Sequence, residues 1–188
     1  MIFKNIVGLT IIALIIWLIP FIIRMSLPSV DNKVNSSVSE KAKISDNVVK
    51  DIFGAYSQNN RKEVFKLIFF NNIKVAIINI VGGIFLGLGT FVNLAQNGFY
   101  AADVFCSIHK NGMSWLKILE YTAPHSFEMI GIWLSGGLGF YIAKLVIGIM
   151  VKNKYPTTLN YKIITISAIS IGLIILFAAY IEAFISVK

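Results

Sequence analysis

Residues 124–151 read PHSFEMIGIWLSGGLGFYIAKLVIGIMV, a run long enough to cross a bilayer in which only Glu128 and Lys144 carry a formal charge. Small residues fall at every fourth position of this run: Gly131, Ser135 and Gly139. Such a stripe lets the backbone of a neighbouring helix approach closely. We therefore expect a transmembrane helix that is pressed against another helix along one face.

The composition indicates an integral membrane protein, since 56% of the 188 residues are hydrophobic and the mean hydropathy is +0.76. The formal net charge is +8, but the Lys and Arg residues flank apolar runs as they do in membrane proteins, so we expect no nucleic-acid partner. The single cysteine, Cys106, excludes an internal disulfide and a cysteine-based metal cluster.

Three further apolar runs have the length of a membrane span, at residues 2–23, 69–95 and 161–186. They predict an all-α, polytopic bundle of four or five transmembrane helices with interfacial amphipathic helices. We divide the chain into an N-terminal transmembrane anchor (1–23), a polar amphipathic helical segment (24–66) and a membrane-embedded helical core (67–188). Pro20 is expected to bend or end the anchor helix.

The polar segment contains Ser37 followed by Glu40, a capping box that predicts an amphipathic helix over residues 38–57. This helix lies either on the membrane or on the bundle itself.

In the run 69–95, Gly83 and Gly87 form a G-x-x-x-G pattern typical of close helix packing, and Asn79 needs a partner for its amide. The turn signal Gln96-Asn97-Gly98 predicts the end of this helix. Residues 99–122 are too polar for a clear span. They form either one poor transmembrane helix or, as we favour, two short helices broken at Asn111-Gly112.

The number of spans decides the orientation. With four spans, the basic segments 24–66 and 152–162 both lie on the cytoplasmic face and both termini are external. With five spans, the N-terminus and the 152–162 loop are cytoplasmic and segment 24–66 is external. The count of positive charges favours four spans.

A polar cluster is expected near one membrane face: His125, Glu128, Glu182 and Asn97. His125 and Glu128 open one helix, and Glu182 lies near the end of the helix antiparallel to it. Two carboxylates and an imidazole could hold zinc with a position open for water, or relay protons. The alternative is a hydrogen-bonded cluster that fixes helix register and uses no cofactor.

Five groups of residues, in order, resemble the stage II sporulation protein M family of integral membrane proteins: Asn71-Asn72-Ile73, Gly82 through Gly87 and Thr90 to Asn97-Gly98, Pro124-His125 with Glu128, Gly136-Gly137 with Gly139, and Ala178-Ala179 with Glu182. The likeness covers residues 69–186. It implies a role in sporulation, as the membrane partner that recruits cell-wall hydrolases during engulfment of the forespore.

We therefore expect a non-enzymatic scaffold, multi-pass in a bacterial cell membrane, whose partners are the lipid bilayer, cell-wall-remodelling proteins and a possible second copy of the chain. The rival hypothesis is a small transporter component or a metal-dependent intramembrane hydrolase that uses His125, Glu128 and Glu182.

Overall fold

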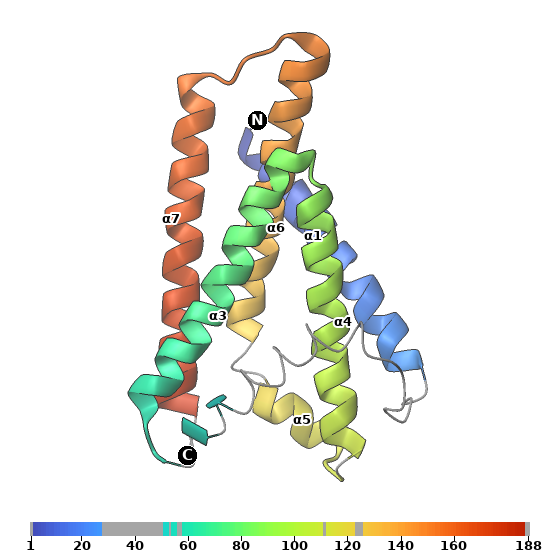
Figure 1. The fold of residues 1–188 in the computed structure, drawn as a ribbon, viewed down its shortest axis with the longest axis vertical. Helices are drawn as coiled ribbons and strands as arrows, with labels where there is room; N and C mark the ends of the chain where they lie inside the picture. The colour runs from blue at the N-terminus through green and yellow to red at the C-terminus, as the bar shows by residue number, and fades with distance from the viewer. Residues whose placement is uncertain are drawn as a thin grey trace.

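The computed structural model describes residues 2–27, 51–52, 54–55, 58–110, 112–122 and 126–186. Within these ranges all regular structure is helical, which confirms the all-α prediction (Figure 1). The elements are α1 (Ile2–Ser26), α3 (Arg61–Gly82), the short 3₁₀ helix η1 (Gly83–Phe85), α4 (Leu88–Lys110), α5 (Trp115–Thr122), α6 (Ser126–Lys152), α7 (Thr158–Ile181) and the π-helical turn η2 (Glu182–Ser186).

Four segments of the described chain are long and apolar enough to cross a membrane: Ile6–Ser26, Arg61–Phe85, Ser126–Lys152 and Thr158–Ile185. Most of each segment is not buried inside the protein, because its apolar side chains point outward. A surface of this kind is stable only in contact with lipid. The protein is therefore a multi-pass membrane protein.

Helix α6 is the centre of the bundle, in contact with α1, α3, α4 and α7. Its small residues are the contact points, since an added Cβ would collide with backbone of α1 at Gly137 and of α3 at Gly139. On the face toward α7, a Cβ at Gly131 would lie 2.7 Å from Ile175. The small residues of α6 thus allow three helices to approach it closely.

Residues 69–95 do not form one helix, so this prediction is wrong. Helix α3 ends at Gly82, and the chain reverses direction at Leu86 and Gly87, whose φ angles are 56° and 82°. It then enters α4, which runs straight through Gln96-Asn97-Gly98, where a turn was predicted. The reversal carries no polar turn residue because it lies among apolar side chains. The amide of Asn97, which resembled a turn residue, instead donates to the backbone oxygen of Asn93 one turn earlier in α4.

Helix α4 also replaces the first of the two short helices expected in residues 99–122. It begins at Leu88, is 23 residues long and ends at Lys110, next to the predicted break, and α5 follows from Trp115. In Figure 1, α3 rises to the tip of a hairpin and α4 returns from it to the end of the bundle where α6 begins. The start of α1 and the α6–α7 loop lie at the opposite end from η2, as the five-span interpretation requires.

Helix α1 continues through Pro20 to Ser26, so the proline does not end it. It packs along α4, where the backbone of Trp17 leaves no room for a Cβ at Gly98. One turn beyond Pro20, Arg24 donates hydrogen bonds to Asp103 of α4, with Nε 2.8 Å from Oδ1. This ion pair fixes the lower end of α1 against α4.

Helix α7 begins at Thr158, three residues before the predicted start, because Thr157 caps it. The Thr157 hydroxyl accepts from the backbone N–H of Asn160, and the Asn160 side chain accepts from the backbone N–H of Thr157. The Asn160 amide also donates to the hydroxyl of Tyr141 at 2.6 Å, which joins α7 to α6. At the other end η2 continues α7 to Ser186.

The amphipathic helix predicted over residues 38–57 lies mostly outside the described residues. Residues 51–52 and 54–55 are helical, and Ala55 is buried in a cluster with Val64, Ala179 and Ala183. This part of the polar segment therefore packs on the bundle, beside the starts of α3 and η2.

Candidate functional site

Glu128 lies in the first turn of α6, which begins at Ser126. Its side chain is buried, with 4% of its surface exposed. A carboxylate in a first helical turn interacts favourably with the positive end of the helix dipole. His125 and Pro124, which the sequence analysis placed beside it, lie outside the described residues.

Glu182 is the first residue of η2 and is also buried, with 5% of its surface exposed. Because Gly131 of α6 faces Ile175 of the antiparallel α7, counting along both helices brings Glu128 level with about Ala178. Glu182 then lies one turn further toward the same end of the bundle. The two carboxylates are thus buried at one end of the membrane core.

Asn97, the fourth member of the predicted cluster, lies in the middle of α4 and bonds toward the bundle centre. Its Nδ2 donates to the backbone oxygen of Asn93 at 2.7 Å. Asn93 in turn donates to Oδ1 of Asn79 on α3 at 2.7 Å and to the backbone oxygen of Val75 at 3.2 Å. The described hydrogen bonds of Asn97 therefore lead away from the carboxylates and into helix packing.

Asn79 is the meeting point of three helices and is completely buried. Its Nδ2 donates to Oγ of Ser135 on α6 at 2.9 Å, and its backbone oxygen accepts from Thr90 of α4 at 2.7 Å. The Ser135 hydroxyl donates a hydrogen bond to the backbone oxygen of Ile132 at 2.7 Å. We name the connected set Asn79, Thr90, Asn93, Asn97 and Ser135 the asparagine ladder.

Sequence reasoning placed Asn97 with the carboxylates and missed Asn93 altogether. The signal for the ladder was the spacing of Asn93 and Asn97, four residues apart in a run without charge, which puts both amides on one helix face. The turn signal at residues 96–98 hid it. In a soluble chain such amides favour turns, whereas in an apolar environment they need partners and find them on adjacent helices.

A metal centre needs more ligands than the described residues bring together. Within the described ranges, no group of three His, Cys, Asp or Glu side chains could hold an ion. The zinc hypothesis requires His125 to join Glu128 and Glu182, and thus depends on a residue outside those ranges. Carboxylates and imidazole are suitable zinc ligands, so the donor set would fit chemically.

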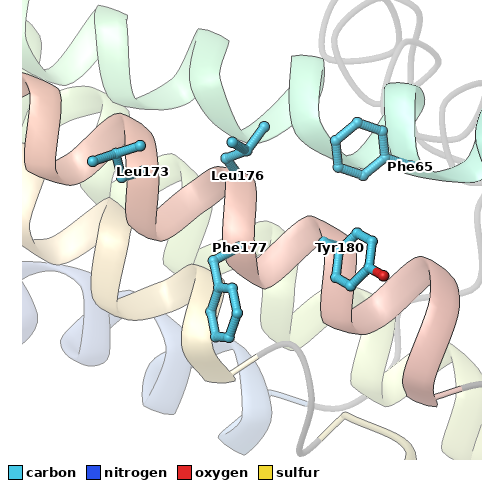
Figure 2. A pocket seen from close by; sticks show the side chains of 5 residues that line it. All are labelled: Phe65, Leu173, Leu176, Phe177 and Tyr180. Carbon is cyan, nitrogen blue, oxygen red and sulfur yellow. The ribbon is translucent and has the colours of Figure 1, made fainter.

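An apolar groove of about 470 Å³ runs between α3 and α7 on the outer surface of the bundle (Figure 2). Phe65 lines it from α3, and Leu173, Leu176, Phe177 and Tyr180 line it from α7. Ligand sites combine apolar walls with a few convergent polar groups, and the Tyr180 hydroxyl is the one polar side-chain group among these five residues. The groove includes no predicted site residue.

Helix α5 lies across the lower end of the bundle in Figure 1. Ile118 is buried on one side, whereas Leu116 and Leu119 are exposed and Lys117 and Glu120 point outward beside them. This pattern is typical of a helix lying in the membrane interface. A hollow of about 340 Å³ opens at the same end, lined by Asp51, Gly54, Ala55, Gln58, Asn60, Glu63 and Leu67.

Comparison with known proteins agrees with this architecture. The family model described as stage II sporulation protein M matches residues 2–187. An uncharacterised protein of the archaeon Methanocaldococcus jannaschii is 32% identical over 156 residues, which cover 73% of this chain and 87% of that protein. No solved structure matches the chain. The family match extends beyond residues 69–186 to the anchor helix and the polar segment, and the chain therefore belongs to the stage II sporulation protein M family.

Proposed function

We propose that this protein is a non-enzymatic membrane scaffold that recruits partner proteins, such as cell-wall hydrolases, at the membrane. The observation that carries the proposal is the asparagine ladder. Asn79, Asn93 and Ser135 satisfy one another and the backbone of adjacent helices, so they join α3, α4 and α6. Buried amides used in this way are packing contacts rather than a binding site.

A scaffold needs a surface that partners can reach, and the lower end of the bundle offers one. Helix α5 and the polar hollow beside Glu63 both belong to this end. The sides of the bundle carry exposed apolar residues that suit lipid. At the other end, the described loop between α6 and α7 spans only residues 153–157. Partner docking at the α5 end is therefore part of the proposal.

The test is crosslinked co-purification of the tagged protein from its native membrane. Charge reversal on α5, with Lys117→Glu and Glu120→Lys together, should reduce the recovery of bound hydrolases. The control, Lys154→Gln in the exposed loop at the opposite end, should leave recovery unchanged. Recovery of an ABC-type ATPase instead of hydrolases, or of no partner at all, would overturn the scaffold proposal.

The second candidate is a proton-coupled transporter component, favoured by one observation. Glu128 and Glu182 are two carboxylates buried at one end of the membrane core. Ionisable residues at membrane depth often belong to proton or ion pathways. The same carboxylates would be zinc ligands if the protein were an intramembrane hydrolase. Substitution of Glu128 distinguishes both chemical roles, proton relay and zinc binding, from a purely structural role.

A further inference from the structure

The hairpin formed by α3, η1 and α4 has a tip unlike the loop of a helix pair that crosses a membrane. No charged residue occurs from position 75 to position 102, a stretch that includes the upper parts of both helices and the reversal between them. The tip exposes large apolar side chains: Ile84 at 56%, Phe85 at 66%, Leu86 at 46% and Leu88 at 67%. Such a surface is unfavourable in water.

Backbone hydrogen bonds within the protein satisfy polar groups on both sides of the reversal. Leu86 and Gly87 make the turn with positive φ angles, and the N–H of Phe91 donates to the oxygen of Gly87 at 2.9 Å. The N–H of Gly83 donates to the backbone oxygens of Ile80 and Val81. Irregular backbone at membrane depth is tolerated where other protein covers it.

Helix α6 provides that cover on one side of the turn. A Cβ at Gly83 would collide with the backbone of Gly139, and one at Gly87 would lie 3.2 Å from the ring of Phe140 and 3.3 Å from Ala143. The other side of the tip is open, since Phe85 and Leu88 are about two-thirds exposed. The tip is therefore shielded by protein on one side and in need of an apolar partner on the other.

The same contacts give the depth of the tip. It lies beside Ala143, whereas α6 continues to Lys152, nine residues further, which is roughly 13 Å along a helix. Figure 1 shows the tip of α3 and α4 ending short of the α6–α7 loop. Lys152 and Lys154 lie at that loop and are suited to mark the membrane surface.

We propose that α3 and α4 form a re-entrant hairpin whose tip is covered by the hydrocarbon core of the bilayer and does not reach the water on the side of the α6–α7 loop. Helices α6 and α7 then cross fully, whereas α1, whose Thr10 lies against Gly137, begins near the level of the tip. Lys144, next to Ala143 and exposed, can extend its long side chain toward the headgroups. Only the α6–α7 hairpin continues to the aqueous surface on that side.

Cysteine labelling in native membrane vesicles tests this depth, because the protein has one cysteine and Cys106→Ser removes it. Phe85→Cys reports on the tip and Asn153→Cys on the α6–α7 loop, and both side chains are exposed, so neither change disturbs the core. A charged, membrane-impermeant maleimide should label Phe85→Cys at least about tenfold less than Asn153→Cys, since water is scarce in the hydrocarbon region. After solubilisation in detergent, both should label.

Two outcomes would overturn the proposal. Equal labelling of Phe85→Cys and Asn153→Cys in intact vesicles would place the tip in water and make α3 and α4 full spans. Disulfide-linked dimers of Phe85→Cys after mild oxidation would show that a second copy of the chain, rather than lipid, covers the tip. Both readouts use the whole protein in its membrane and do not depend on the proposed scaffold function.

Discussion

Asn79 joins three helices through hydrogen bonds in the apolar interior. Its amide donates to Ser135 and accepts from Asn93, and its backbone oxygen accepts from Thr90. In a bilayer the hydrophobic effect does not favour one helix contact over another, so packing and hydrogen bonds decide the register. The ladder therefore determines where α3, α4 and α6 meet.

Asn79→Leu should destabilise the protein, because it removes the bonds to the buried Ser135 and the half-buried Asn93. Interhelical hydrogen bonds in membrane proteins contribute on average about 0.6 kcal/mol and at most about 1.7 kcal/mol each, so a loss of about 1–3 kcal/mol is expected. Asn71→Leu, at an exposed position of α3, is the control. Thermal unfolding in detergent measures both, and equal melting temperatures would contradict the role of the ladder.

Glu128→Gln separates structure from chemistry at the buried end of α6. For a scaffold, the loss of charge near the helix N-terminus should lower stability by about 0.3–2 kcal/mol and reduce abundance, while partner capture per folded molecule stays the same. Glu120→Gln, exposed on α5, should leave stability unchanged. An unchanged melting temperature together with loss of transport or hydrolysis would instead assign Glu128 a chemical role.

Between helices, close backbone contact replaces side-chain interlocking. Gly83 is predicted from the G-x-x-x-G pattern to lie in a helix contact, and the structure places it against Gly139. The partner helix could not be predicted, since the pattern indicates only that one face of the helix carries small residues. The reversal at Gly87 was missed for a related reason: in an uncharged run, the same glycines suit both a straight packed helix and a tight turn.

Gly83→Ala and Gly172→Ala should have opposite effects. At Gly83 the backbone is in the right-handed helical region, so alanine is not strained by φ, but its Cβ would collide with Gly139. Overpacking of this kind costs about 1–3 kcal/mol. Gly172, inside α7, has open space around it, so alanine there should stabilise the helix by up to about 1 kcal/mol. Thermal unfolding in detergent checks both, and a Gly83→Ala protein as stable as the parent would show that η1 can move away from α6.

For the bundle as a whole, the membrane class and three of the helices could be predicted from hydropathy alone. The runs that became α1, α6 and α7 are apolar over more than the thickness of a bilayer. Helix α4 could not be predicted, because Asn93, Asn97 and Asp103 lower its hydropathy. Asn93 finds its partners on α3, Asn97 bonds to Asn93 within α4, and Asp103 pairs with Arg24 of α1. A sequence window contains no information on the distant partners among these.

The path of the chain through the bundle predicts which ends share a side of the membrane. The start of α1 and the α6–α7 loop lie at one end and η2 at the other (Figure 1). A protease-cleavable tag ahead of α1 and one inserted at Asn153 should therefore be cut from the same side of sealed vesicles, and a tag after η2 only from the opposite side. This outcome is the same whether α3 and α4 cross the membrane or form a re-entrant hairpin. In both cases the chain leaves α4 on the side of the membrane from which it entered α3. If the tags ahead of α1 and after η2 were both cut from one side, the chain would cross the membrane an even number of times. This is the four-span interpretation that the charge count favours, and it would contradict the fold.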